Sequence, residues 1–270
     1  MTNQVDHKNY SISTHQLNLW YGEFHALKSM NLKIKAGKIT ALIGPSGCGK
    51  TSLLRCFNRL NELNRYAKTT GIVQILGRDI YASSVSLTSL RRNVGMVFQS
   101  PNPLPMSIYS NILFSLRIHM RRGEFTRSQL DEMVESALRE VWLWDDVKDQ
   151  LNEPLGQLSL EQQQKLCIAR LLPLCPQILL MDEPCSALDA EGREHIEDLL
   201  EKLSSRHTII LVTHDMGQVR RLSQETIFML NGSVIEADTT FNMFHHPKRP
   251  ETNLYISGDY GTRPSLISIS

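Results

Sequence analysis

Hydrophobic and polar residues alternate over the first part of the chain. Between residues 15 and 35, apolar side chains recur at every second position: Leu17, Leu19, Tyr21, Met30, Leu32 and Ile34. This period of two is typical of strands with one buried face, and Gly22 and Gly37 supply turns. The pattern predicts antiparallel strands over residues 15–35, after a polar segment, residues 1–12, that we expect to be loose.

Further along the chain, short apolar runs stand between helical patterns. The runs are residues 39–43, 94–99, 178–181 and 208–212, and each has the length of a strand that is buried on both faces. Residues 191–203 carry apolar side chains at helical spacing instead. Strands that alternate with helices predict a mostly parallel sheet, and therefore an α/β fold class.

A proline-rich break precedes a mainly helical stretch. Residues 100–105 contain three prolines directly after a predicted core strand, and they interrupt regular structure. Residues 106–175 then follow helical periodicity. A helix within them is expected to begin at Ser159, with Gln162 placed to complete a capping box. We therefore expect a helical insertion in the α/β domain.

Composition and charge narrow the class of protein. Hydrophobic residues make up 41% and charged residues 21% of the 270 positions, as in ordinary globular domains. The net charge of +1 gives no electrostatic reason to expect a nucleic-acid partner. We find neither an apolar run long enough to span a bilayer nor a signal-peptide pattern. The five cysteines form no C-x-x-C pair and are expected to be reduced thiols.

One motif points to chemistry. Residues 44–51 match the phosphate-binding pattern G-x-x-x-x-G-K-[ST] at every fixed position. The loop's glycines allow the backbone to approach phosphates, and its N–H groups point at them from the start of a helix. Lys50 adds a positive charge, and the Thr51 hydroxyl is a candidate ligand for Mg²⁺. The alternative is a glycine-rich turn that binds nothing, but the preceding strand and following helix favour a nucleotide site.

Four polar residues at or just after predicted strand ends extend this site. Asp182 follows an apolar strand and is a candidate Mg²⁺ ligand, and the adjacent Glu183 suits a general base for an attacking water. Gln99 is a candidate to ligate the metal or orient that water, and His214 is a candidate γ-phosphate contact. Each has a structural alternative, since polar residues are common at strand ends, but their combination with the loop favours hydrolysis of a nucleotide.

These motifs resemble those of the ATP-binding subunits of ABC transporters, over about residues 13–262. The resemblance implies a P-loop NTPase (RecA-like) α/β core with an N-terminal antiparallel β subdomain and an inserted α-helical subdomain. The core would comprise residues 13–100 and 176–240 and the helical signature subdomain residues 101–175, with loose tails at 1–12 and 263–270.

The resemblance also implies the cofactors, ATP and Mg²⁺, and the residues that hold them. Tyr21, which its position alone favours as a core residue, would stack on adenine. Glu183, His214 and Gln99 would be catalytic, and Thr51, Gln99 and Asp182 would hold the metal. The remaining nucleotide contacts would be Gly44, Pro45, Ser46, Gly47, Cys48, Gly49, Lys50, Thr51, Ser52, Ser159, Gln162 and Asp189.

Four shorter sequence segments are similar to the phosphate-importing branch of the family. Residues 97–103, 162–170, 181–184 and 255–258 carry that likeness. It implies a homodimer that binds two ATP between its protomers and works with two transmembrane permease subunits and an external solute-binding protein. The expected location is the cytoplasmic face of the cell (inner) membrane, as a peripheral subunit without a nucleic-acid partner.

The signature segment departs from the family pattern. The family reads Leu-Ser-Gly-Gly-Gln, whereas this chain has Leu158-Ser159-Leu160-Glu161-Gln162. Leu160 and Glu161 add side chains where a close backbone approach is expected, and Glu161 would repel a triphosphate. We expect hydrolysis to be slowed or retuned but not lost, and an unchanged ATPase rate in a Leu160→Gly/Glu161→Gly variant would contradict this.

Three alternatives remain open at the sequence level. An importer of another solute, such as polar amino acids, is compatible with the same motifs because the ATPase subunit does not touch the cargo. An ATP-gated regulatory module is compatible with the altered signature, although Glu183 and His214 argue against it. A soluble ABC-type ATPase of DNA repair or translation is disfavoured by the single P-loop and the lack of heptads.

Overall fold

The computed structural model describes residues 9–119, 124–156 and 158–258. These residues divide between two compact units, Met1–Ser83 with Ile210–Ser270, and Ser84–Ile209, which are described here one at a time. The predicted loose tail at 263–270 and the first eight residues of the other tail lie outside the described ranges.

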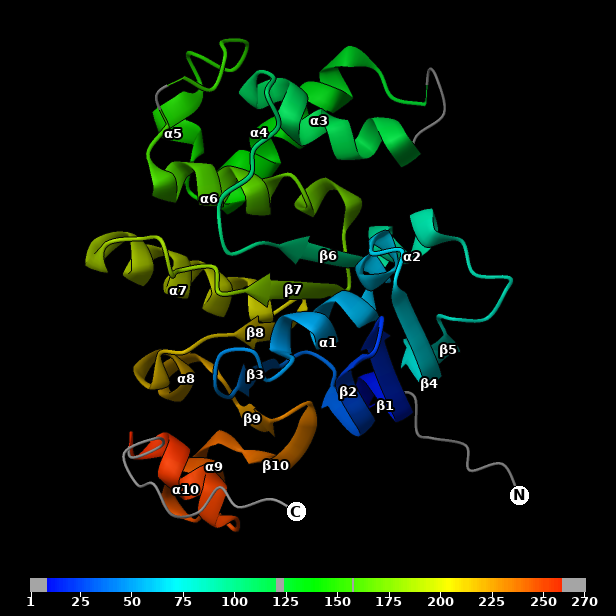
Figure 1. Ribbon diagram of the computed structural model, residues 1–270. Helices are drawn as coiled ribbons and strands as arrows, with labels where there is room; N and C mark the ends of the chain where they lie inside the picture. The colour runs from blue at the N-terminus through cyan, green and yellow to red at the C-terminus, as the bar shows by residue number, and fades with distance from the viewer. Residues whose placement is uncertain (1–8, 120–123, 157, 259–270) are drawn as a thin grey trace. The chain divides into compact units, whose positions relative to one another are not determined.

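The first unit contains a four-stranded antiparallel sheet in the order β2-β1-β4-β5 (Figure 1). This confirms the antiparallel strands predicted from the alternating pattern. The prediction of a loose segment through residue 12 is wrong at its end, because Ile12 pairs with Ile34 and Ile75 and is fully buried. The strands are β1 (Tyr10–Tyr21), β2 (Phe24–Lys35), β4 (Ala67–Ile75) and β5 (Arg78–Asp79).

A second group of strands in this unit carries the phosphate-binding loop. All five residues of β3 (Ile39–Ile43) are buried, and β3 runs parallel to β9 (Glu225–Leu230). An antiparallel hairpin joins β9 to β10 (Ser233–Thr239). Its turn, Asn231-Gly232, has φ of 49° and 80°, as a two-residue turn of positive φ requires. An Asn-Gly pair is typical of such a hairpin turn.

Helices complete the core of the first unit. Buried Phe228 of β9 stacks on Tyr255 with ring centroids 5.0 Å apart, and Val219 and Met243 pack in the same cluster. The last two helices were not predicted from the sequence. The helical elements are α1 (Lys50–Phe57), the 3₁₀ turn η1 (Leu60–Leu63), α8 (Met216–Leu222), α9 (Thr240–His245) and α10 (Pro250–Ile256).

The second unit combines two parallel strands with helices. β6 (Val94–Val97) pairs with β7 (Ile178–Asp182) in parallel, which agrees with the prediction of parallel strands joined by helices. The strand β8 (Thr208–Val212) crosses the boundary between the units in the sequence. The helical elements are α2 (Leu87–Asn93), α3 (Ile108–His119), α4 (Arg127–Glu140), α5 (Trp144–Val147), α6 (Leu160–Ala169), the 3₁₀ turn η2 (Leu172–Leu174) and α7 (Ala190–Ser204).

The start of α6 follows the predicted capping geometry. The Ser159 hydroxyl accepts a hydrogen bond from the backbone N–H of Gln162 at 3.2 Å. In return, the Gln162 side-chain oxygen accepts the backbone N–H of Ser159 at 3.0 Å. This reciprocal pair satisfies two N–H groups that a helix start otherwise leaves without partners. The prediction that a helix begins after Ser159 is confirmed.

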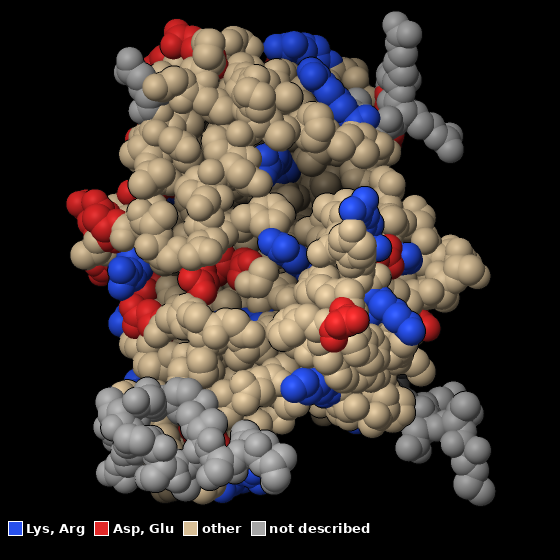
Figure 2. All heavy atoms as spheres, viewed as in Figure 1, with Lys and Arg blue, Asp and Glu red and all other residues tan. Residues whose placement is uncertain are grey.

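The surface carries both signs of charge. On the face in Figure 2, blue and red side chains are scattered among uncharged ones, without one dominant basic region. Within the described ranges, no helix is both long and apolar enough to cross a membrane.

Candidate nucleotide site

The glycines of the phosphate-binding loop have geometries that other residues adopt poorly. Gly44 has a φ of 151°, and a Cβ there would lie 2.2 Å from the backbone oxygen of Met229. Gly49, the N-cap of α1, has a φ of 106°, and its Cβ would approach Leu27 to 2.9 Å. Both positions therefore require glycine, since an added methyl group would have to move neighbouring atoms. The two glycines therefore let the loop pack closely against Met229 and Leu27.

The Lys50 ammonium group lies against its own loop. Lys50 is 5% exposed, and its Nζ donates hydrogen bonds to the backbone oxygens of Gly44 at 2.8 Å and Pro45 at 3.1 Å. Burial raises the pKa of the neighbouring Cys48 thiol, although the Lys50 charge opposes that shift. Cys48 therefore stays a neutral thiol, and the positive charge of Lys50 dominates the loop.

The loop is also held by residues from the far end of the chain. The Tyr255 hydroxyl of α10 donates to the Gly44 backbone oxygen at 2.8 Å, and the Gly232 N–H donates to the Cys48 backbone oxygen at 3.0 Å. These two contacts fix the backbone of the loop from the β9–β10 turn and from α10. Sequence reasoning missed both, because neither Tyr255 nor Gly232 belongs to a nucleotide-binding motif.

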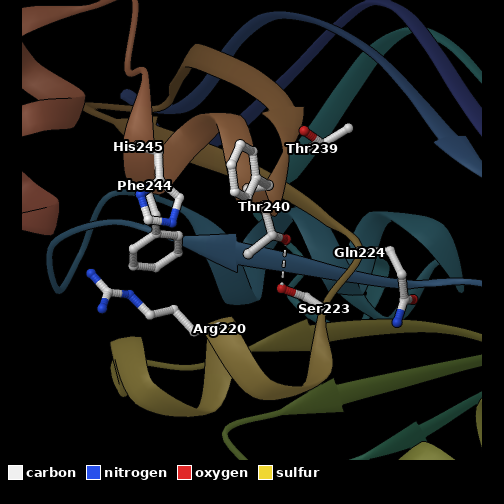
Figure 3. A pocket seen from close by; sticks show the side chains of 8 residues that line it. Arg220, Ser223, Gln224, Thr239, Thr240, Phe244 and His245 are labelled. Atoms are coloured by element: carbon white, nitrogen blue, oxygen red, sulfur yellow. Dashed lines mark hydrogen bonds between the residues drawn. The ribbon is translucent and has the colours of Figure 1, made fainter.

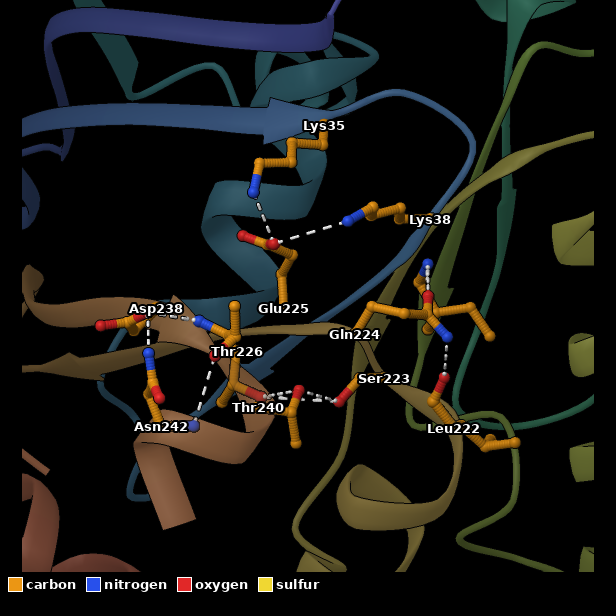
Figure 4. A network of polar contacts seen from close by, with 12 residues as sticks. Lys35, Lys38, Leu222, Ser223, Gln224, Glu225, Thr226, Asp238, Thr240 and Asn242 are labelled. Carbon is orange, nitrogen blue, oxygen red and sulfur yellow. Dashed lines mark hydrogen bonds and ion pairs between the residues drawn. The ribbon is translucent and has the colours of Figure 1, made fainter. Parts of the chain in front are cut away.

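A polar network positions the strand that leads into the loop (Figure 4). At the start of β3, the Ile39 N–H donates to the Gln224 side-chain oxygen at 2.8 Å. Glu225 follows Gln224 in the sequence. Its Oε1 lies 2.7 Å from Nζ of Lys35 and 3.8 Å from Nζ of Lys38. The buried hydroxyl of Thr240 lies within hydrogen-bond distance of its neighbours on Ser223 and Thr226. The network thus ties β3 to β9 and to the start of α9.

In the second unit, two of the predicted catalytic side chains form a hydrogen bond with each other. The side-chain N–H of Gln99 donates to Oε2 of Glu183 at 3.1 Å. Glu183 follows β7 directly and has a φ of 51°, a conformation that costs a non-glycine residue free energy and is common at functional sites. The preceding residue, Asp182, is the last of β7 and is only 6% exposed. The geometry therefore presents Glu183 from a fixed, strained turn.

A residue that was not predicted supports this pair. Gln164 of α6 is fully buried, and its side-chain N–H donates to the backbone oxygen of Pro184 at 2.9 Å and lies 3.4 Å from that of Phe98. Phe98 and Pro184 are the neighbours of Gln99 and Glu183 in the sequence. Gln164 thus ties the two catalytic segments to the signature helix α6, and no signal in the sequence singled it out.

The remaining predicted residues lie where the sequence suggested. Tyr21 ends β1 and is half buried, so its ring is not enclosed in the core. His214 is exposed and lies two residues after the end of β8, beside Asp215, which caps α8. Asp189 caps α7 by accepting the Gly192 N–H at 2.9 Å. The nucleotide contacts expected of Tyr21, His214 and Asp189 remain predictions.

Glu161, the unusual signature residue, has two positively polarised neighbours. Its Oε1 lies 2.6 Å from Nζ of Lys165 and 2.9 Å from Nδ1 of His195. Burial alone would raise the pKa of the Glu161 carboxyl, but hydrogen bonds and charges from Lys165 and His195 outweigh it and lower the pKa. The carboxylate is therefore paired within its own unit, which weakens the repulsion toward a triphosphate expected from the sequence.

The predicted metal ligands have suitable chemistry. Thr51 offers a hydroxyl, Asp182 a carboxylate and Gln99 an amide oxygen, and Mg²⁺ prefers such oxygen ligands. Thr51 belongs to the first unit and the other two belong to the second. The residues of each unit, taken separately, therefore have the chemistry that a magnesium-nucleotide requires.

A separate cavity of about 400 Å³ lies at the C-terminal end of the first unit (Figure 3). None of the predicted site residues lines it. The Arg220 guanidinium lies 4.5 Å from the centre of the Phe244 ring, and the hydroxyls of Ser223 and Thr240 are already paired with each other at 3.0 Å. The other lining residues are Gln224, Thr239, Phe241 and His245.

Comparison with known proteins shows the family of this chain. Residues 27–186 match the family model described as "ABC transporter", and the chain belongs to this family. A curated relative, the phosphate import ATP-binding protein PstB of Oceanobacillus iheyensis, is 48% identical over 257 residues, which cover 95% of this chain and 92% of the relative.

Two solved structures share the fold. The cbiO1 protein of Clostridium perfringens, part of the ABC transporter complex cbiONQ, aligns with a TM-score of 0.76 and 28% identity, over 88% of this chain and 92% of that one. The ATP-binding cassette MJ0796, a dimer in a post-hydrolysis state bound to ADP and Pi, aligns with a TM-score of 0.72 and 30% identity, over 85% and 98%. The α/β P-loop NTPase fold predicted from the sequence is confirmed.

Proposed function

We propose that this chain is the ATP-hydrolysing subunit of an ABC importer that carries inorganic phosphate across the cytoplasmic membrane. The observation that carries the hydrolytic part is the bonded pair of Gln99 and Glu183 beside Asp182. A carboxylate held by an amide at the end of a core strand suits a general base. A phosphate-binding loop with buried Lys50 supplies the matching nucleotide contact.

The chain's own residues divide the work of hydrolysis. The backbone of residues 44–49 and the Lys50 ammonium group bind and orient the β- and γ-phosphates. Glu183 accepts a proton from the attacking water, and Gln99 holds Glu183 in place. Thr51, Asp182 and Gln99 would hold Mg²⁺, which when bound neutralises phosphate charge. His214 would contact the γ-phosphate and Tyr21 would stack on the adenine ring.

The subunit is proposed to act as a homodimer with ATP between the protomers. The signature segment around Ser159 and Gln162 and the cap of α7 at Asp189 would face the partner's nucleotide. The dimeric, ADP-bound state of the related cassette MJ0796 supports this arrangement. We also propose that the subunit works with two transmembrane permease subunits and an external solute-binding protein. Its proposed location is peripheral, at the cytoplasmic face of the membrane.

The cargo assignment rests on the relative. At 48% identity over nearly the whole chain, the phosphate import protein makes inorganic phosphate the leading cargo. The ATPase subunit itself does not touch the solute, so the assignment is tested by transport. Cells that lack this protein should take up less labelled phosphate and recover on re-expression, whereas unchanged uptake would reject phosphate as the cargo.

The first experiment is ATP-dependent dimerisation of a Glu183→Gln variant, followed by size-exclusion chromatography with light scattering. Glutamine keeps the shape of the site but removes the base, so ATP should be trapped and the protein should shift from monomer to dimer only when ATP and Mg²⁺ are present. A Glu183→Gln/Lys50→Met variant should stay monomeric. A chain that only senses ATP would bind the nucleotide without any change in mass.

A further inference from the structure

We propose that Glu161 is a positioning residue, which joins the signature helix α6 to the start of α7 through His195. The inference rests on the proposed function, because it concerns the segment that would meet the partner's nucleotide. Glu161 stands where the family pattern has glycine, and its side chain connects two helices of the same unit. We expect this connection to govern assembly of the composite ATP site.

The contacts of Glu161 run in two directions. Oε1 lies 2.6 Å from Nζ of Lys165, one turn further along α6, and 2.9 Å from Nδ1 of His195 on α7. A carboxylate oxygen only accepts hydrogen bonds, so Nδ1 carries the proton in this contact. Lys165 is 9% exposed at its side chain. The pair Glu161–Lys165 is thus partly sheltered from water, and His195 adds the link to the second helix.

The Glu161 side chain also lies against the cap of α7. A Cβ added to Gly192 would lie 3.4 Å from Cβ of Glu161 and 3.0 Å from Oδ1 of Asp189. Gly192 is therefore the small residue that lets Glu161 come close to the Asp189 turn. The same Asp189 oxygen accepts the Gly192 N–H. The signature segment and the Asp189 turn consequently form one packed arrangement.

The start of α6 is held from a second side as well. The side-chain N–H of Gln162 donates to Oδ2 of Asp146 on α5 at 3.2 Å, while its oxygen completes the Ser159 cap. The first turn of α6 is thus held by two contacts with other helices. Gln162 contacts Asp146 on α5, and Glu161 contacts His195 on α7. Loss of the His195 anchor would remove the contact that links this turn to α7, while Asp146 and buried Gln164 would still hold α6.

Glu161 is therefore expected to support assembly of the ATP site and not merely to repel the triphosphate. Because its carboxylate is occupied by Lys165 and His195, the residue holds the signature segment in a fixed position relative to Asp189. Removing the link should loosen the surface that meets the partner protomer. Binding of ATP to the monomer should not change, since neither Glu161 nor His195 is among the residues proposed to bind the monomer's own nucleotide.

The test uses the full chain in the Glu183→Gln background. We expect His195→Ala to raise the ATP concentration for half-maximal dimer formation about fivefold, with monomer ATP affinity, measured by fluorescent-nucleotide displacement, unchanged. His195→Asn should restore dimerisation, because the asparagine amide can donate to Glu161. Glu161→Ala together with His195→Ala should be no worse than Glu161→Ala alone.

A control variant and two contrary outcomes distinguish failure of the positioning role from failure of the proposed function. Glu135→Gln removes an exposed ion pair with Arg139 on α4 and should leave dimerisation unchanged. If the parent Glu183→Gln protein does not dimerise with ATP, the proposed function and this inference both fail. If the parent dimerises and His195→Ala behaves as the parent does, or lowers monomer ATP affinity by the same factor, only the positioning role is rejected.

Discussion

Burial decides which cysteines of this chain can react. Cys56 on α1 is fully buried, and desolvation raises the pKa of its thiol to about 12. Cys175, by contrast, is exposed at the end of η2. Because the thiolate is the nucleophile and must be reached by the reagent, the two positions should differ sharply. The three remaining cysteines are buried as well.

We expect one fast-reacting thiol per native chain. Ellman's reagent at mildly alkaline pH should modify Cys175 rapidly, and Cys56 only after unfolding in denaturant. The absorbance time course reports both phases. Cys175→Ser should abolish the fast phase, and its persistence in that variant would show that a buried thiol becomes accessible in the native state.

The charge on Glu161 predicts a pH dependence of stability. Its folded-state pKa lies below the ordinary 4.5, so its stabilising effect is full above that pH and is lost as the pH falls through the folded-state pKa. Glu161→Gln should lower the free energy of unfolding by about 1–2 kcal/mol near neutral pH, since Lys165 loses its partner. Urea unfolding of both proteins should show this gap shrinking below about pH 4.5. A gap that does not depend on pH would contradict an ionised Glu161.

At the scale of elements, local signals were predictable and distant partners were not. The Ser159 cap depends on residues within a few positions, so the sequence predicted it. One of the two partners of Glu161, His195, lies 34 residues away, and the contact of Tyr255 with Gly44 spans 211 residues. Such contacts depend on how elements pack together, which no short pattern encodes.

An irregularity between β1 and β4 predicts a sensitive glycine. Gly71 has a φ of 92°, and a Cβ there would lie 2.2 Å from the backbone oxygen of Gln16, where the pairing of the two strands shifts register. Gly71→Ala should cost about 2–3 kcal/mol. Gly22→Ala is the matched control, since Gly22 also has a positive φ but nothing within 4 Å of an added Cβ.

Chemical unfolding distinguishes steric collision from backbone strain. Gly22→Ala should cost about 1 kcal/mol, the cost of a left-handed conformation alone. Equal losses in both variants would mean that the β1–β4 irregularity rearranges to accept a methyl group.

Over the whole molecule, nucleotide binding should act as a source of stability. A ligand that binds only the folded state adds about 2.7 kcal/mol at a concentration one hundred times its dissociation constant. For a chain of 270 residues, that corresponds to a rise in Tm of roughly 5–10 °C. Thermal unfolding with and without ATP and Mg²⁺ measures it. Lys50→Met should abolish the rise, and a rise that survives this substitution would mean that ATP binds elsewhere.

The residues that carry the chemistry of the site could be predicted from the sequence more readily than the residues that hold them in place. The loop at 44–51 and the strand-end residues Gln99 and Glu183 stand in recognisable local contexts, and the structure pairs the last two. Gln164 and His195 have no such context, because a buried glutamine and a half-exposed histidine acquire meaning only from the atoms around them.

The bond between Tyr255 and Gly44 also sets an order of events during synthesis. The first unit is made of two segments, and the second unit, Ser84–Ile209, is inserted between them. At about 5–20 residues per second, a ribosome needs roughly 10–40 s to travel the 211 residues from Gly44 to Tyr255. The inserted unit is complete well before the phosphate-binding loop acquires its last anchor. A newborn chain therefore carries an unfinished loop after its other half has been synthesised, and truncation after Ile235, which removes Tyr255, should weaken ATP binding as measured by fluorescent-nucleotide displacement.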